Sequence, residues 1–568
     1  MKRLHLLGLI LGIITVLYIT PELFYTFVYS RFRDYDTELM SPLFWTLLLI
    51  LLSCAVLVTL FHERLYKPRI ILPILGVFSF ILFYSHSIIV TWDSAHYLSF
   101  TAIINGDIPM DSWDVVRGPT YPFILWLSIK MLGMTTDAML LVHYAFYIAT
   151  LCLYYLIAKK ILPLNTASKK LSAVILIYII IGLNPLIFGY YHVLLTEYLA
   201  SFFVALIIYF AINYYFCLKN DKVDKKYRTS QLVLILSCPI LFFLKQNYLM
   251  LLLGAIIAIV ALTILQRCGK KITLRAFRLL LYTVMAFFTA FSVWNAMLPE
   301  AEADYMSDWT SESLLIAVLI PDTAYINYID DDEGMVVAFY DKNNNPVNTY
   351  ITHGITSKNE LSVANAMSIS IKNFFRHPLL VISGVLDSYL SGIGVYSANV
   401  AEWRVQRVVS IHGADENSSI GYYILSPYSQ NVLRTNPRLT KYAEPFERES
   451  FASPTITGAI SRMVIPTNLV FSIGFLLLPP VWIGSIVLLI RYKKEMNFSI
   501  SFISATISLG YLFLNSIAQL IIDRYNFPIF ISAWIAIFSL LYGIVQLRYT
   551  AKTQTLIASD NCEAIQHP

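Results

Sequence analysis

Charged residues are scarce in this sequence: of 568 residues only 14% are Asp, Glu, Lys or Arg, while 57% are hydrophobic. A soluble globular protein carries about 25% charged residues, so the composition excludes an ordinary soluble domain. Windows of about 18 to 25 apolar residues, long enough to cross a bilayer as a helix, recur along the chain except between about Leu298 and Pro466. The sequence therefore predicts an all-α polytopic membrane protein with one large aqueous loop.

Cysteine is also scarce, and none lies in the 298–466 loop; the six are Cys54, Cys152, Cys217, Cys238, Cys268 and Cys562. Without a disulfide framework the loop must fold around its own core, and we expect a mixed α/β domain. The net charge of +5 comes from short basic clusters between apolar runs, which membrane orientation explains better than nucleic-acid binding. Repeats of about 20 to 50 residues are missing too, which argues against a solenoid.

About twelve spans follow from the hydropathy. They are 5–28, 42–61, 70–91, 138–160, 171–190, 194–217, 231–245, 248–266, 278–297, 467–490, 498–521 and 527–547. The basic loops between them all fall on one side if both termini are cytoplasmic, as the positive-inside rule requires. The chain then divides into an N-terminal membrane region (1–297), an extracytoplasmic loop domain (298–466) and C-terminal helices with a short cytoplasmic tail (467–568).

The same orientation places the first large loop, 92–117, on the outer face. Asp93 stands there at the end of an apolar run, His96 lies one helical turn later, and Asp107 precedes the closing Arg117. The segment 118–133, in which Tyr121 lies between two prolines near the start, predicts an interfacial helix. A carboxylate at a helix end can be a simple terminus marker, but an acid, an imidazole and a guanidinium in one small loop favour a site.

Further ionisable residues lie near the predicted outer boundary. Glu197 falls about one turn inside a span, where such residues usually face the interior or a watery cavity. Lys245 ends a helical hairpin, and Arg524 and Tyr525 open the last span. Lipid-headgroup anchoring explains the two cations as well as phosphate binding does.

Together these residues form a chemically coherent set. A hydroxyl becomes a good nucleophile when a positioned base takes its proton. A lipid phosphate leaves more readily when fixed positive charges stabilise it. This is the chemistry needed to move a sugar from a lipid phosphate to a hydroxyl outside the cytoplasm.

The pattern resembles the GT-C superfamily of polyprenyl-phosphate-sugar-dependent glycosyltransferases, including the protein O-mannosyltransferases of glycosyltransferase family 39 and the aminoarabinose transferases that modify lipid A. The likeness lies in short segments spread over most of the chain. These are "WDSAHYLSFTAIINGDIP" (92–109), "RGPTYPFILWLSIKMLG" (117–133), "LLTEYLASFFVALII" (194–208), "KNFFRHPLLVISG" (372–384) and "DRYNFPIFISAWIAI" (523–537). Two features differ from the family pattern: two spans precede the helix that leads to Asp93, and "RGPTYP" replaces a Lys-Pro-Pro type of reentry.

The resemblance implies an inverting, single-displacement transferase. Asp93 would be the catalytic general base, and Arg117, Lys245 and Arg524 would bind the donor phosphate. Supporting or substrate-binding roles would go to His96, Asp107, Tyr121, Glu197 and Tyr525. Some members of the superfamily use a divalent cation such as Mg or Mn and others do not, so the metal ligands remain unknown.

Two alternatives stay open. A lipid-linked polysaccharide polymerase or ligase would depend on arginines of the large loop, such as Arg404, Arg407 and Arg434. A transporter or flippase would show paired repeats and broken helices around a midplane site. The expected partners are a polyprenyl-phosphate-linked sugar donor, a glycan, lipid or protein acceptor, and the bilayer, with no nucleic acid. The expected location is the bacterial cytoplasmic membrane, with the endoplasmic reticulum as the alternative and the active site on the outer face.

Overall fold

The computed structural model describes residues 68–84, 88, 92–110, 117–297, 327–331, 334–340, 346–352, 437–449, 473–493, 495–518 and 526–565, with isolated helical positions at 375, 378, 382, 386 and 389. The predicted spans 5–28 and 42–61 lie outside these residues. The chain forms two compact units. The first comprises 1–113, 119–202 and 403–470, and the second 114–118, 203–402 and 471–568.

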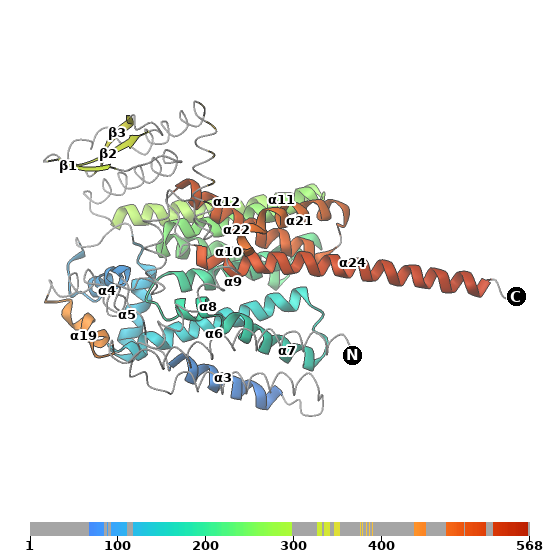
Figure 1. The fold of residues 1–568 in the computed structure, drawn as a ribbon, viewed down its shortest axis with the longest axis horizontal. Helices are drawn as coiled ribbons and strands as arrows, with labels where there is room; N and C mark the ends of the chain where they lie inside the picture. Colours follow the sequence, from blue (N-terminus) through green and yellow to red (C-terminus); the bar gives the residue numbers. More distant parts are fainter. Residues whose placement is uncertain are drawn as a thin grey trace, which may run out of the picture. The chain divides into compact units, whose positions relative to one another are not determined.

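The regular elements that the structure describes in the first unit are all helices (Figure 1). Its elements are α3 (Pro68–Tyr84), α4 (Trp92–Ile104), α5 (Thr120–Leu132), α6 (Thr136–Ile161), α7 (Ala167–Ile177), the π-helical turn η3 (Tyr178–Gly182), α8 (Pro185–Tyr190) and α19 (Thr440–Glu449). Helix α9 (Glu197–Lys219) begins in this unit and continues into the second. The predicted helix at 118–133 is confirmed as α5.

The second unit holds the remaining elements. They are α10 (Lys225–Leu244), the 3₁₀ turn η4 (Gln246–Tyr248), α11 (Leu249–Leu265), α12 (Lys270–Met297), strands β1 (Asn327–Asp331), β2 (Gly334–Tyr340) and β3 (Pro346–Thr352), α21 (Leu478–Arg491), α22 (Met496–Ala518), η5 (Phe527–Ile529) and α24 (Phe530–Ile565). The strands form one antiparallel sheet in the order β1-β2-β3, within the segment predicted to be the aqueous loop. The predicted short tail is part of α24, which runs to Ile565 (Figure 1).

Seven helices in the described part are long and apolar enough to cross a membrane. They cover Thr136–Ile161, Glu197–Lys219, Lys225–Leu244, Gln246–Leu265, Lys270–Met297, Met496–Ser516 and Phe527–Tyr549. Each coincides with a predicted span to within several residues. The protein is therefore a helical polytopic membrane protein, as its composition predicts.

Local sequence signals explain where the helices begin and end. The Thr135 side chain caps α6 by accepting a hydrogen bond from the Ala138 amide, and Asp224 caps α10 by accepting one from the Tyr227 amide. Lys159 and Lys160 occupy the last turn of α6, where cations complement the helix dipole. Three connections between helices, at 161–167, 219–225 and 265–270, each lie within a stretch of sequence rich in Lys and Arg.

In three of the predicted spans the structure does not show one continuous helix over the predicted range. The segment 171–190 is interrupted by η3, in which the Leu183 amide bonds the Tyr178 carbonyl five residues back, at 2.8 Å. Pro185 then starts a separate helix, since a proline lacks the amide hydrogen that a continuous helix needs. The segment 70–91 overlaps the 17-residue α3, which begins at Pro68 and ends at Tyr84, and 467–490 overlaps the 14-residue α21, which follows a turn at Leu477.

Candidate functional site

The predicted base, Asp93, is the second residue of α4, a helix of 13 residues. The contacts of its side chain lie outside the described part of the structure. The helix that carries it is almost completely enclosed, with Ala95, Leu98 and Ala102 at 0% exposure. The backbone of such a helix has little room to move, so a side chain on it starts from a fixed Cα position.

The N-terminal half of α4 is held by the segment that precedes α9. The buried Ser94 hydroxyl donates to the Leu194 carbonyl at 2.8 Å. One turn later the Tyr97 hydroxyl lies 3.5 Å from the Thr196 hydroxyl, which donates to the Glu197 carboxylate at 3.4 Å. Glu197 is 1% exposed, so this predicted site residue is an interior group connected to α4 through Thr196 and Tyr97.

Tyr121 is likewise an interior residue, with 0% exposure. Its hydroxyl lies 3.2 Å from His143 Nε2, and its ring meets the Tyr97 and Tyr198 rings edge-on, with centroids 5.0 and 5.8 Å apart. The structure therefore brings Tyr121 into the same polar and aromatic interior as Glu197. His96 is half-buried, with its ring against Phe100.

The C-terminal end of α4 has the geometry of a Schellman motif. The Gly106 amide bonds the Ile103 carbonyl and the Asp107 amide bonds the Ala102 carbonyl, both at 2.9 Å. Gly106 has φ +81°, the left-handed conformation that this motif requires and that glycine adopts without steric cost. Asp107 is thereby fixed to the helix by its own backbone.

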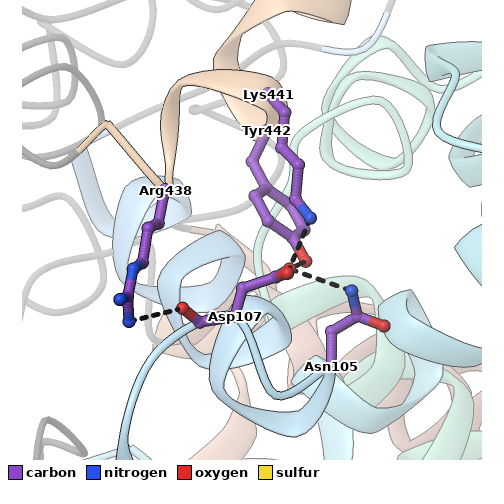
Figure 2. Close-up of polar contacts among 5 residues, drawn as sticks. All are labelled: Asn105, Asp107, Arg438, Lys441 and Tyr442. Carbon is purple, nitrogen blue, oxygen red and sulfur yellow. Dashed lines mark hydrogen bonds and ion pairs between the residues drawn. The ribbon is translucent and has the colours of Figure 1, made fainter.

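The Asp107 carboxylate is the centre of a polar cluster that joins two distant parts of the chain (Figure 2). Lys441 of α19 donates to one carboxylate oxygen at 2.7 Å, and Tyr442 donates to the other at 2.5 Å. Asn105 donates to that second oxygen at 2.9 Å, and Arg438 donates to the Asp107 carbonyl at 3.4 Å. We refer to Asn105, Asp107, Arg438, Lys441 and Tyr442 as the Asp107 clamp.

The clamp alters the ionisation of its own members. Burial alone would raise the pKa of the Asp107 carboxyl, but the hydrogen bonds from its three side-chain partners and the Lys441 charge outweigh it and lower the pKa to about 2. Burial, and then the bond to Asp107, raise the pKa of the Tyr442 hydroxyl. Asp107 is thus held as a carboxylate and Tyr442 as a neutral donor across the physiological range.

A hollow of about 520 Å³ lies beside the clamp. It is lined by the start of α6, at Met134, Thr135, Thr136 and Asp137, and by Lys441, Glu444 and Pro445 of α19. Lys441 belongs to both the clamp and the hollow, so α19 must be docked for the hollow to exist.

The backbone segments that carry two of the predicted phosphate-binding cations approach each other in the second unit. A Cβ on Gly118 would lie 1.9 Å from the Phe243 carbonyl oxygen, so only glycine permits this approach of the 117–118 backbone to the end of α10. Arg117 immediately precedes Gly118, and Lys245 follows Phe243 by two residues as the C-cap of α10. The Arg117 and Lys245 backbones therefore lie close together, although 128 positions separate them in the sequence.

The surroundings of Lys245 are polar and aromatic. Its Nζ lies 5.9 Å from the centre of the Tyr248 ring, which stacks on Tyr511 with centroids 6.2 Å apart. Asn247 donates to Asn515 at 3.5 Å. Arg524 and Tyr525 lie outside the described residues.

A divalent cation would need a set of oxygen or nitrogen ligands. Among the described residues no group of three or more His, Cys, Asp or Glu side chains could hold a metal ion. Asp107, the acid of the first loop whose contacts are described, already accepts three hydrogen bonds. The described residues thus show no metal site, and the divalent cation stays a prediction that they do not test, since the side chain of Asp93 lies outside them.

The sequence did not predict a site role for Asn105, Arg438, Lys441 or Tyr442. Lys441 and Tyr442 lie 334 and 335 positions from Asp107. Each belongs to a common residue type in a polar segment, so no local pattern indicates the contact. His143 and Tyr198 were missed because a lone polar residue in an apolar run predicts only a buried position.

Comparison with protein-family models, with curated proteins and with solved structures finds no match to this chain in any of the three. Its function is therefore argued from its own residues.

Proposed function

We propose that the protein is a membrane glycosyltransferase of the GT-C type, which moves a sugar from a polyprenyl-phosphate donor to an acceptor hydroxyl on the extracytoplasmic face. The observation that carries the proposal is the packing of Gly118 against Phe243, because it brings the backbones that carry two cations, Arg117 and Lys245, close together at the end of one membrane helix. A lipid phosphate at headgroup depth would meet cations in such a place.

The reaction needs one base and a stabilised leaving group. Asp93 takes the proton from the acceptor hydroxyl as the hydroxyl oxygen bonds the anomeric carbon. The bond from that carbon to the phosphate oxygen breaks in the same step, and the electron pair stays on the polyprenyl phosphate. Arg117, Lys245 and Arg524 stabilise this charge, and the displacement inverts the anomeric centre.

Other parts of the chain take roles consistent with this scheme. The helix α4 holds the backbone of Asp93 in place, and Glu197 and Tyr121 support this helix from the interior. The full protein has about twelve spans, both termini in the cytoplasm and a mixed α/β domain at 298–466 that meets the acceptor. Its place is the bacterial cytoplasmic membrane.

Donor binding tests the proposal at the residues that carry it. A panel of polyprenyl-phosphate sugars is offered to the full-length protein in lipid nanodiscs, and the affinity and consumption of each donor are measured. Losing a hydrogen bond to a charged group costs about 1.5–3 kcal/mol, so Arg117→Gln and Lys245→Gln should each weaken binding by roughly tenfold or more.

Lys130→Gln is the matched control, because Lys130 is an exposed cation in the last turn of α5. It should bind the donor as the wild type does. If the wild type neither binds nor consumes any donor in the panel, the proposed function is wrong. If the wild type binds a donor and both variants match it, the phosphate assignment is wrong.

A further inference from the structure

We propose that α19 is a positioning element for the catalytic helix: Lys441 and Tyr442, acting through Asp107, fix the end of α4 and thereby the place of Asp93. The contacts of the clamp are observed in the structure, whereas its effect on catalysis rests on the proposed function.

Asp107 is tied to the end of α4. Its amide is part of the Schellman motif that ends the helix, bonded to the Ala102 carbonyl at 2.9 Å. Asn105, in the same turn, donates to the Asp107 carboxylate from its side chain at 2.9 Å. The position of the carboxylate and the position of the end of α4 are therefore coupled.

The Asp107 carboxylate is held by α19 at both of its oxygens. Lys441 and Tyr442 each bond a different oxygen, so the carboxylate plane is fixed as well as its position. Hydrogen bonds with a charged partner are shorter and stronger than neutral ones, and the 2.5 and 2.7 Å distances agree with this. Arg438 adds a bond to the Asp107 carbonyl, so three side chains from one short stretch hold a single residue.

The start of α19 is itself held by packing. Tyr442 and Leu439 are 0% and 4% exposed, and the Tyr442 amide donates to the Leu439 carbonyl at 2.8 Å. The part of α19 that reaches Asp107 is therefore packed into the first unit, while Lys441 stays half-exposed beside it.

The other described contacts of α4 include bonds to α5 and to the segment that precedes α9. Ser94 bonds Leu194 near the start of the helix, and Thr101 bonds the Pro122 carbonyl of α5 at 3.3 Å. Among the described contacts of α4 and its end turn, those of the clamp alone come from the segment predicted to be the outer loop. The clamp thus lets the loop domain, which would meet the acceptor, set the position of the helix that carries the base.

Hydrogen exchange measured by mass spectrometry tests the clamp without any activity. Full-length wild type and Asp107→Asn are compared in lipid nanodiscs, after size exclusion confirms equal folded yield. Release of the clamp should speed exchange at least about fivefold in peptides covering 101–107 and 437–449, because local opening sets the exchange rate. Tyr442→Phe, a milder change that keeps the ring, should show the same effect to a smaller degree.

Asp137→Asn is the matched control, because Asp137 lines the neighbouring hollow but makes no contact in the clamp. It should leave exchange in both segments unchanged. Unchanged exchange in both Asp107→Asn and Tyr442→Phe would overturn the clamp.

Steady-state transfer with the donor identified above tests positioning. Asp107→Asn should lower kcat at least about tenfold and leave the KM for the donor within about twofold, because a misplaced base slows the chemical step and not binding. Lys441→Gln should behave likewise, and Lys441→Arg should restore kcat. Faster exchange with unchanged kcat would overturn the positioning role. A wild type without any transfer activity would overturn that role together with the proposed function, while the exchange result would still decide the clamp.

Discussion

Asp107 is held as a carboxylate by partners from two distant parts of the chain, and this makes the stability of the protein depend on pH. Because the folded-state pKa of about 2 lies below the ordinary value, the clamp stabilises the protein above the ordinary pKa. The contribution is lost as the pH falls through about 2.

The pH dependence of the melting temperature checks this point. The melting temperature of the wild type should exceed that of Asp107→Asn by a constant amount from about pH 5 to pH 8. This difference should shrink below about pH 4, near the ordinary Asp pKa. A difference in melting temperature that grows on acidification would contradict the assigned pKa.

Gly118 offers a second test at the residue scale. Gly118→Ala places a methyl group against the Phe243 carbonyl oxygen, so the 117–118 backbone must move away from α10. Overpacking of this kind costs about 1–3 kcal/mol, and the displacement of Arg117 should also raise the KM for the donor. Thermal unfolding in detergent and donor kinetics measure the two effects.

Gly269→Ala is the control for this variant, because nothing lies within 4 Å of the added carbon at that position. A Gly118→Ala protein that melts and binds donor as the wild type does would show that Arg117 and Lys245 do not depend on this packing.

At the scale of elements, α11 and α22 approach closely at a glycine. A Cβ on Gly254 would lie 3.1 Å from the Ile507 Cα, and small residues at membrane-helix interfaces allow such close backbone packing. Gly254→Leu should therefore lower the free energy of unfolding by about 1–3 kcal/mol. Gly76→Ala in α3, where the added carbon meets nothing within 4 Å, should have little effect. Equal melting temperatures for the two variants would contradict the close packing.

The sequence predicted elements better than contacts. Apolar runs located α6, α9 and α11 to within several residues, because the bilayer imposes a minimum length on a spanning helix. The interruption at Tyr178–Gly182 was not predicted, since hydropathy averages over the window and hides a local change of helix type. The Asp107 clamp could not be predicted either, because nothing in a single sequence pairs residues 334 positions apart.

At the scale of the whole molecule, the orientation in the membrane is the prediction with the widest consequences. The six native cysteines all fall in predicted membrane or cytoplasmic segments, so intact cells should react little with an impermeant maleimide. Glu444→Cys, in α19, should react in intact cells. Lys271→Cys, at the start of α12, should react only after the cells are permeabilised. The reverse pattern would place the proposed site in the cytoplasm and remove the reason for a lipid-linked donor.

The most direct test of the account is a single-turnover experiment on Asp93. Wild type and Asp93→Asn are loaded with the same polyprenyl-phosphate sugar, donor affinity is measured, acceptor is added, and the rate of sugar transfer is followed. General-base catalysis contributes about 10²–10⁴-fold, so we expect Asp93→Asn to bind the donor normally and to transfer at least about 100-fold more slowly. Transfer by Asp93→Asn at the wild-type rate would contradict the account.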